Sequence, residues 1–371
     1  MKKTLHLVSF DVPFPADYGG VIDVFYKIKA LHQLGVDIIL HCFQYGRPQQ
    51  EILNKYCSKV YYYNRSKYKN PFIGKIPYIV LTRNNEELLD NLKVDNFPIL
   101  FDGLHCTYFL NHKALKNRIK LVRNHNIEHD YYKNLEKVET NFFKKYFFRT
   151  EADNLKEYEK VLLKAAKVLA ISPSDFNYLN SQYKNAVLVS AFHANETVEI
   201  EKGKGKFILY HGNLSVGENN HAALYLVKEV FSKIEIPVVI AGNNPSTELK
   251  DICAKYANIQ LISYWNNEEI EAAIRQAQMN VLVTFQATGI KLKLLNALFK
   301  GRFCVVNPQM VEQTGLENTC SIAKDANIMI EIIQAKWDKE FENNDILNRK
   351  KILNNEMFSN TTNAQKIIDL I

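Results

Sequence analysis

Short apolar runs alternate along the chain with longer segments in which apolar residues recur every three or four positions. The short runs are rich in Val, Ile, Leu and Phe and predict buried β-strands, whereas the wider spacing predicts helices with one apolar face. Strands that alternate with helices in this way are typical of parallel α/β sheets. The predicted strands are residues 4–10, 36–43, 60–63, 97–101, 119–123, 168–171, 187–189, 207–210, 238–240, 259–262, 279–284, 303–306 and 320–323.

Helical spacing fills most of the intervals between these strands. One predicted helix, residues 131–166, is unusually long, and the chain is again predicted to be helical from residue 343 to residue 371. A polar, charged and glycine-bearing stretch at residues 195–206 is the best candidate for a domain boundary. Because a strand, glycine loop, helix and strand follow one another in both halves, the pattern predicts two nucleotide-binding-type sheets in tandem.

The most informative segment is residues 284–307, where a strand end, a glycine turn, an amphipathic helix and a second apolar strand follow one another. Gly289 gives the turn its backbone freedom, and Lys291 and Lys293 lie in or beside the first helical turn. A helix N-terminus at the carboxyl edge of a sheet, flanked by two ammonium groups, suits a diphosphate. A helix packed on a sheet with two solvated lysines has the same spacing, so the pattern alone does not decide between the two interpretations.

Polar residues also follow strands in the first half of the chain. Gly19 and Gly20 lie in the predicted loop after the first strand, and His105 and His125 each come shortly after a later strand. If these strands belong to one parallel sheet, all of these residues share its carboxyl edge, where open α/β sheets bind ligands. Histidine at such an edge suits proton transfer or polar recognition, although a loop histidine is also often a structural hydrogen-bonding residue.

Composition narrows the classes of protein. The formal charge of +7 is a mild basic excess, compatible with anionic small molecules or an anionic membrane surface, and we expect no nucleic-acid partner. The six cysteines are scattered and never form a CxxC pair, which predicts buried free thiols and a reducing, cytoplasmic setting. The N-terminal residues lack a signal-peptide pattern, and the sequence predicts no transmembrane helix.

Residues 142–149 interleave phenylalanine and tyrosine with lysine and arginine on the long predicted helix. Aromatic and basic side chains on one helix are typical of a segment that lies at a membrane interface. The same spacing is typical of a core face with solvated lysines. Both interpretations stay open at this point.

Several stretches carry a resemblance to a known family, in that family's order and over nearly the whole chain. They are PADYGGVIDVFYKIKALHQLGVDI, FDGLHCTYF, VRNHNIEHDYY, LAISPSDFNYL, YHGNLSVGENNHAALYLV, VIAGNNP and ATGIKLKLLNALFKGRFCVVN. The sequence resembles retaining glycosyltransferases of the GT-B architecture, specifically the family 4 group of bacterial polysaccharide biosynthesis. The resemblance implies two Rossmann-like α/β domains facing across a cleft: an acceptor-side domain at 1–194, a nucleotide-sugar-binding domain at 206–354, and a helix at 355–371 crossing back to the first.

The resemblance also implies roles for particular residues. It gives His105, His125 and Lys293 catalytic roles, and it assigns donor and diphosphate binding to Gly19, Gly20, Gly212, Asn213, Thr288, Gly289, Ile290, Lys291 and Asn296. We expect no cofactor and no metal, because the chain contains no Asp-X-Asp sequence and the lysines at a helix N-terminus can stabilise the leaving diphosphate instead. In this family no protein nucleophile is required, since the donor phosphate helps to deprotonate the acceptor.

The sequence departs from the family pattern at the donor site. Thr288 and Asn296 stand where glutamates are usual, and the loop at residues 214–220 lacks the usual arginine and lysine. The first hypothesis is a cytoplasmic hexosyltransferase-type enzyme that uses a nucleoside-diphosphate sugar and a glycan or lipid-linked acceptor, in peripheral contact with the inner membrane. The second is a catalytically degenerate GT-B protein that binds nucleotide-sugar or glycan without turnover. An epimerase or a phosphorylase on the same scaffold is a third, which no motif favours.

Overall fold

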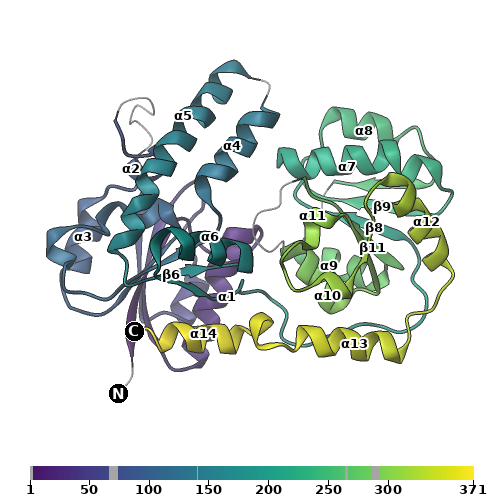
Figure 1. The fold of residues 1–371 in the computed structure, drawn as a ribbon. Coiled ribbons are helices and arrows are strands. Elements are labelled where there is room, and N and C mark those ends of the chain that lie inside the picture. Colours follow the sequence, from purple (N-terminus) through teal and green to yellow (C-terminus); the bar gives the residue numbers. More distant parts are fainter. Residues whose placement is uncertain (1–2, 67–73, 140, 264–265, 286–291) are drawn as a thin grey trace. The chain divides into compact units, whose positions relative to one another are not determined.

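The computed structural model describes residues 3–66, 74–139, 141–263, 266–285 and 292–371. Two compact units make up the chain, and each has its own parallel sheet with helices packed on it (Figure 1). The first unit is Met1–His193 together with Glu356–Ile371, and the second is Ala194–Asn355. The predicted α/β architecture with two Rossmann-like domains is therefore confirmed.

The described residues of the first unit form a sheet of seven parallel strands in the order β3-β2-β1-β4-β5-β6-β7. Apolar side chains are buried in two clusters, as expected for a parallel sheet that is covered on both faces. Because β4 pairs with both β1 and β5, the carboxyl ends of these three strands meet at one edge. The strands are β1 Thr4–Ser9, β2 Asp37–Gln44, β3 Lys59–Asn64, β4 Ile99–Asp102, β5 Lys120–Asn124, β6 Lys167–Ala170 and β7 Ala186–Leu188.

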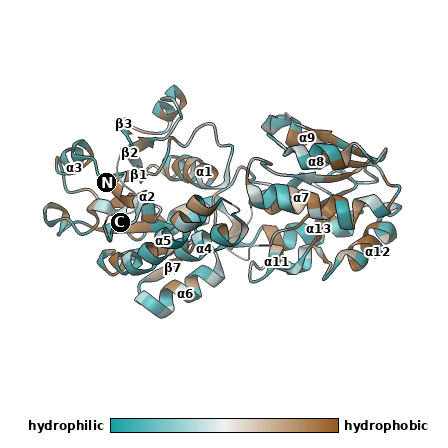
Figure 2. Cartoon of the chain, turned by 90° about the horizontal axis from the view of Figure 1, so that it is seen from above, coloured by the Kyte–Doolittle hydropathy of each residue, from teal (hydrophilic) through white to brown (hydrophobic). Residues whose placement is uncertain are grey.

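Helices of the first unit are amphipathic, with hydrophilic and hydrophobic sides in Figure 2. α14 (Asn360–Ile368) packs against α1 (Gly19–Gln33), and its residues Ala364 and Ile367 join Ile28 of α1 in one apolar cluster. The later part of the chain therefore contributes to the core of the first unit. The other helices of this unit are α2 Tyr78–Leu81, α3 Glu86–Leu92, α4 Glu128–Val138, α5 Phe142–Tyr158 and α6 Pro173–Tyr183.

The prediction of a single long helix at residues 131–166 is wrong. Two helices, α4 (Glu128–Val138) and α5 (Phe142–Tyr158), pack against each other as a hairpin (Figure 1). The Asn141 side chain accepts a hydrogen bond from the backbone N–H of Lys144, which is the capping geometry that begins a new helix. The aromatic periodicity continues through this cap, so periodicity alone did not reveal the break.

The helical stretch predicted at residues 343–371 is likewise divided, into α13 (Asn343–Leu353) and α14 (Asn360–Ile368). Ser359 begins α14, because its side chain accepts a hydrogen bond from the backbone N–H of Thr362. None of the helices in the described ranges combines the length and the apolar character that crossing a bilayer requires.

In the second unit, the residues that the structure describes form a sheet of six parallel strands in the order β10-β9-β8-β11-β12-β13. The predicted segment at residues 284–307 is confirmed where it is described, since a helix with buried leucines lies between two fully buried strands. The strands are β8 Ile208–His211, β9 Val238–Ala241, β10 Ile259–Ile262, β11 Met279–Leu282, β12 Phe303–Val306 and β13 Ser321–Ile322. The helices are α7 Gly217–Glu229, α8 Thr247–Cys253, α9 Asn267–Gln276, α10 Leu292–Lys300, α11 Pro308–Val311, α12 Ala326–Trp337 and α13.

Candidate functional site

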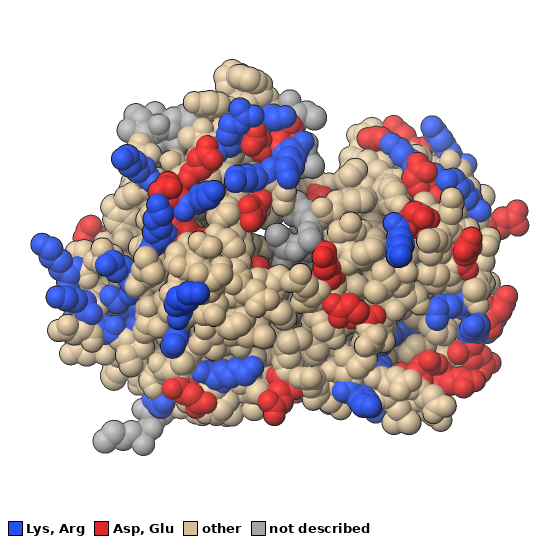
Figure 3. Space-filling model, viewed as in Figure 1, with Lys and Arg blue, Asp and Glu red and all other residues tan. Residues whose placement is uncertain are grey.

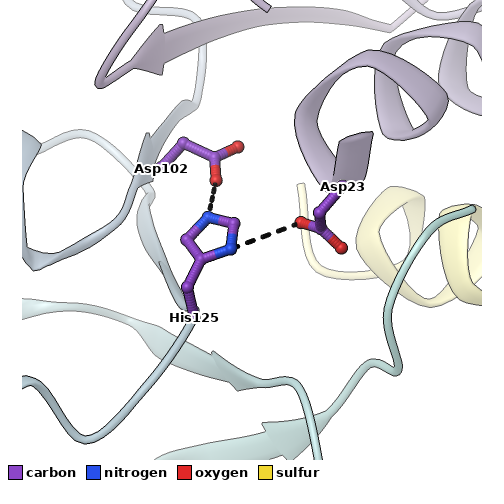
Figure 4. A group of neighbouring side chains, drawn as sticks. All are labelled: Asp23, Asp102 and His125. Carbon is purple, nitrogen blue, oxygen red and sulfur yellow. Dashed lines mark hydrogen bonds and ion pairs between the residues drawn. The ribbon is translucent and has the colours of Figure 1, made fainter. Parts of the chain in front are cut away.

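The carboxyl edge of the first sheet holds a histidine between two buried carboxylates (Figure 4). Asp102 ends β4, His125 follows β5, and Asp23 lies in the second turn of α1. The Nε2 atom of His125 lies 2.5 Å from Asp102 Oδ1, and its Nδ1 atom lies 3.9 Å from Asp23 Oδ2. Both ring nitrogens of this predicted site residue therefore face acidic groups, which fixes the orientation of the ring.

Two buried cations neutralise these carboxylates. Lys27 Nζ lies 2.6 Å from Asp102 Oδ2 and 3.0 Å from Asp23 Oδ2, while Arg123 Nη2 lies 2.7 Å from Asp23 Oδ1. Burial alone would raise the pKa of Asp23, but Arg123, Lys27 and His125 outweigh burial and lower it. For Asp102, Lys27 and the hydrogen bond from His125 likewise outweigh burial and lower the pKa. Two ionised carboxylates thus balance two cations.

Asp23, Asp102 and His125 are also spaced so that one ligand atom from each could surround a metal ion, with these atoms within 4.8 Å of one another. The chemistry of the group does not fit this role. Lys27 and Arg123 already bind the two carboxylates, so a divalent cation would add two uncompensated charges to a buried and neutral cluster. We therefore assign the cluster to ion pairing and to positioning of His125.

His105 lies beside this cluster and contacts it through Phe10, whose ring centroid lies 5.7 Å from that of His105 and 5.5 Å from that of His125. The Nδ1 atom of His105 is 4.0 Å from Glu128 Oε1 and has no hydrogen-bond partner among the described residues. Burial and the charge of Arg83 hold the pKa of His105 well below its usual range. The ring is therefore neutral near pH 7, and it can donate one hydrogen bond and accept another, which suits a sugar hydroxyl.

Glu128, the first residue of α4, is buried next to His105. Burial, with repulsion from Glu159, raises the pKa of Glu128 to about 8, although Arg83 opposes this shift. The carboxyl group is therefore mostly protonated at neutral pH. His105 consequently faces an uncharged neighbour, and this part of the edge is suited to polar recognition of an uncharged group.

Gly19 and Gly20 are the first two residues of α1, so their predicted place in the preceding loop is wrong. A Cβ atom at Gly20 would lie only 2.6 Å from Cζ of Phe10, so glycine allows the helix to approach this ring. Phe10 in turn contacts His105 and His125. The structure therefore brings the predicted glycines and the two predicted histidines to the same edge of the first sheet.

In the second unit, Lys293 links α10 to the loop that follows β8. Lys293 Nζ donates a hydrogen bond to Asn219 Oδ1 at 3.0 Å, and Asn219 Nδ2 donates to the backbone carbonyl of Asn213 at 3.0 Å. A Cβ atom at Gly212 would lie 3.3 Å from Asn219 Cγ, so this glycine also lies against the asparagine. Three predicted donor-site residues are thus brought together by Asn219, at the beginning of α7. An ammonium group beside a helix N-terminus suits a diphosphate.

Two residues of β8 lie close to Lys293. Its Nζ atom is 5.5 Å from the centroid of the Tyr210 ring. Burial and the charge of Lys293 lower the pKa of His211 to about 3, so this imidazole is neutral at physiological pH. Glu218, in the first turn of α7, accepts a hydrogen bond from the Thr284 hydroxyl just after β11. With His211 neutral, Lys293 is the positively charged side chain that the described part of the chain brings to this corner of the sheet.

Asn296 lies one turn after Lys293 on α10, so the two side chains share a helix face. Its Oδ1 atom accepts a hydrogen bond from Asn195 Nδ2 at 2.8 Å, which holds the amide in one orientation. The other predicted residues of this segment lie outside the described residues: Thr288, Gly289, Ile290 and Lys291.

Sequence reasoning missed the ion-paired cluster around His125. A signal was present, because Asp23 and Lys27 are four residues apart within an apolar helical stripe and Arg123 lies in an apolar strand. Charged residues are seldom buried without partners, so such positions suggest mutual pairing. Asn219 was also missed, because its contact with Lys293 depends on the tertiary structure.

Residues 205–335 match the family model described as Glycosyl transferases group 1. A protein of Klebsiella pneumoniae, described as an uncharacterized 44.6 kDa protein in cps region, is 26% identical over 328 residues, which are 83% of this chain and 84% of the relative. The solved sucrose-phosphate synthase of Thermosynechococcus elongatus is similar with a TM-score of 0.70 and 14% identity, over 100% of this chain and 98% of that chain. The E. coli trehalose-6-phosphate structure bound with UDP-2-fluoro glucose has a TM-score of 0.65 and 11% identity, over 99% of both chains.

The family match covers most of the second unit and includes Gly212, Asn213, Lys293 and Asn296. The solved structures establish the fold, since their sequence identity to this chain is low. Membership of the narrower family 4 group stays a prediction. Residues 205–335 thus match glycosyl transferases group 1, the chain has the GT-B fold, and the two findings together support a glycosyltransferase.

Proposed function

We propose that this chain is a retaining, metal-independent glycosyltransferase that moves a sugar from a nucleoside-diphosphate sugar to a hydroxyl group of a glycan or lipid-linked acceptor. The observation that carries the proposal is the link from Lys293 through Asn219 to the Gly212–Asn213 loop. The leaving group is a nucleoside diphosphate, whose developing charge needs preorganised donors. The UDP-2-fluoro glucose bound to the E. coli structure supports a donor of this kind.

The charge balance of the first unit supports a mechanism without a metal ion and without a protein nucleophile. Asp23 and Asp102 are both engaged by Lys27, and Asp23 is also engaged by Arg123, so neither carboxylate is placed to attack a sugar. In the proposed reaction the acceptor oxygen attacks the face that the leaving group departs from. The acceptor proton passes to a phosphate oxygen of the donor. His105, held neutral by burial and Arg83, recognises a sugar hydroxyl.

The test is donor-dependent release of nucleoside diphosphate by the full chain. Lys293→Ala should lower this release at least 100-fold, because one preorganised charged donor is worth about 3–4 kcal/mol in the transition state. Lys228→Ala is the matched control, since Lys228 is an exposed lysine of α7 that pairs with Glu248. Unchanged turnover in Lys293→Ala would refute the assignment of the diphosphate site.

One contact favours the second candidate, a degenerate protein that binds donor without turnover. Asn296 stands where the family usually has a glutamate, and its Oδ1 already accepts a hydrogen bond from Asn195. A thermal-shift panel of UDP-, GDP-, TDP- and ADP-sugars separates the candidates when it is combined with the release assay. A shift with one nucleotide but no release, with acceptor extracts supplied, would support the degenerate protein.

We propose that the α4–α5 hairpin makes the peripheral membrane contact. Phe142 is 75% exposed, Phe143 79% and Tyr146 55%, next to Lys144 and Arg149. Figure 3 shows residues other than Lys, Arg, Asp and Glu at the tip of this hairpin, with Lys and Arg side chains just below and Asp and Glu side chains among them. Aromatic groups that enter the interface above basic groups suit anionic lipid, and a lipid-linked acceptor would be presented there.

Flotation with anionic vesicles tests this contact. Replacing Phe142 and Phe143 together by Ser should lower vesicle binding more than 10-fold, because burying each ring is worth about 1.5–3 kcal/mol. Val94→Ser is the control, since Val94 is also 79% exposed but lies away from the hairpin, after α3. Equal flotation of both variants and the wild type would refute the hairpin as the contact.

The proposed setting is the cytoplasmic face of the inner membrane, in surface polysaccharide biosynthesis. The cps-region relative supports polysaccharide biosynthesis. The six free thiols support a reducing compartment. Cell fractionation is the corresponding measurement: recovery in an oxidising extracellular fraction would contradict this setting.

A further inference from the structure

Cys304 and Cys320 lie next to each other at the edge of the second sheet. β12 and β13 pair in parallel, with Val305 opposite Ser321. Cys320 has an extended backbone (φ −123°, ψ 157°) directly before β13, so the same register places it opposite Cys304. In-register residues on neighbouring strands point to the same face and are about 5 Å apart, within the range of Cα separations that a disulfide spans.

The two thiols differ in access and in acidity. Cys304 is 3% exposed, whereas Cys320 is only partly buried. A hydrogen bond between the two thiols raises the pKa of Cys304 and lowers that of Cys320. The Thr319 hydroxyl, 3.5 Å from Cys320 Sγ, and the buried Arg349 guanidinium also favour the Cys320 thiolate, while burial and, to a smaller extent, Glu317 oppose it. Because the thiolate is the reactive form, Cys320 is the more nucleophilic and more accessible of the pair.

A cavity of about 190 Å³ adjoins both thiols. Lys336 of α12 and Arg349 of α13 line it, together with Asn348 and Asp345. Two cationic side chains beside two thiols suit a small disulfide that carries carboxylate groups. This cavity lies among residues that have no part in the diphosphate site described above.

We propose that Cys304 and Cys320 form a reactive dithiol that reduces small anionic disulfides of the glutathione type and closes into a disulfide of its own. The Cys320 thiolate attacks one sulfur of the small disulfide, whose S–S bond breaks to release one thiolate. Cys304 then gives its proton to solvent and attacks the Cys320 sulfur, releasing the second thiolate. One disulfide is reduced to two thiols, and two protein thiols are oxidised to one disulfide.

The other four cysteines serve as internal controls, because burial raises the pKa of each thiol. They are Cys42, Cys57, Cys106 and Cys253. The experiment treats the full chain with glutathione disulfide, alkylates the remaining thiols and maps the peptides by mass spectrometry. We expect a Cys304–Cys320 cross-link that forms at least 10-fold faster than any modification of Cys253.

Two variants identify the order of attack. Cys304→Ala should retain one glutathione on Cys320, because the resolving thiol is missing, and Cys320→Ala should leave Cys304 unmodified. Cys253→Ala, the matched control, should form the cross-link at the wild-type rate. Modification of Cys320 no faster than Cys253, or a stable mixed disulfide on Cys320 in the wild type, would overturn the proposal. The wild-type map alone decides this if a variant fails to fold, and the readout does not depend on glycosyl transfer.

Discussion

Replacing Glu128 by Gln should stabilise the first unit increasingly as the pH rises. The pKa of Glu128 is about 8 in the folded chain, against an ordinary value of 4.5, and burial is the main cause. A carboxyl group with a raised folded pKa keeps its proton in the fold after the unfolded chain has lost it. Its contribution to stability is therefore fully present below pH 4.5 and is lost as the pH rises toward 8.

The size of this effect follows from the two pKa values. Each unit of difference is worth about 1.4 kcal/mol, so the whole shift corresponds to about 5 kcal/mol at high pH. Between pH 5 and pH 7 the loss is about 2.5 kcal/mol, since the unfolded carboxyl ionises over this range while that of Glu128 does not. Glutamine has a similar shape and cannot ionise, so Glu128→Gln removes this loss.

The assay compares melting temperatures of Glu128→Gln and wild type from pH 5 to pH 8. For a unit of this size, about 2.5 kcal/mol corresponds to a difference in Tm that grows by about 5–10 °C between pH 5 and pH 7. Glu87→Gln is the control, because Glu87 is an exposed carboxylate of the same unit. Glu128→Gln and wild type share all other titrating groups, so the effect of those groups cancels in the difference between their melting temperatures at each pH. Parallel Tm curves for Glu128→Gln and wild type would refute the reasoning that burial keeps Glu128 protonated.

Three further predictions concern the same edge of the first sheet. Lys27→Met should lower the free energy of unfolding by about 3–5 kcal/mol in urea titrations, because it leaves Asp102 buried without its cation. The pKa values of Asp23 and Asp102 are lowered in the fold, so the contribution of these two carboxylates to the stability of the fold is present above about pH 4 and is lost as the pH falls. Acid titration followed by circular dichroism should show this loss. Gly20→Ala should displace Phe10 and lower kcat/KM several-fold with a loss of about 1 kcal/mol in stability, measured by initial rates and urea midpoints.

Much of the fold could be predicted because a short run of apolar residues directly indicates a buried strand. The predicted bounds of the strands at Ile259–Ile262 and Phe303–Val306 agree with the structure, and both strands lie between helices in the sequence. The break before α5 could not be predicted from periodicity, because a single side chain, Asn141, caps the new helix within an aromatic pattern that continues past it. The capping hydrogen bond of Asn141 therefore begins a new helix at a place where the amphipathic spacing predicts a continuous one.

For the site, the rule that ligands bind at the carboxyl ends of strands was enough to predict that His105 and His125 lie together. The partners of His125 could not be predicted in the same way. Asp23 and Arg123 are 100 residues apart in the chain and meet only when α1 packs on β5. A contact of this kind depends on the tertiary structure, so the local spacing that suggests the Asp23–Lys27 pair does not show that Asp23 also pairs with Arg123.

The packing of α14 on α1 has a consequence for how the chain is made. The backbone N–H of Ser190 donates a hydrogen bond to Asn363 Oδ1 at 3.1 Å, and Ile367 is fully buried in the first unit. A ribosome must therefore synthesise all of Ala194–Asn355 before the helix that completes the first unit is available. During that interval the apolar face of α1 that α14 later covers is exposed to solvent and to chaperones. The residues of the second unit are contiguous and are synthesised before α14, so the second unit can complete its folding before the first unit does.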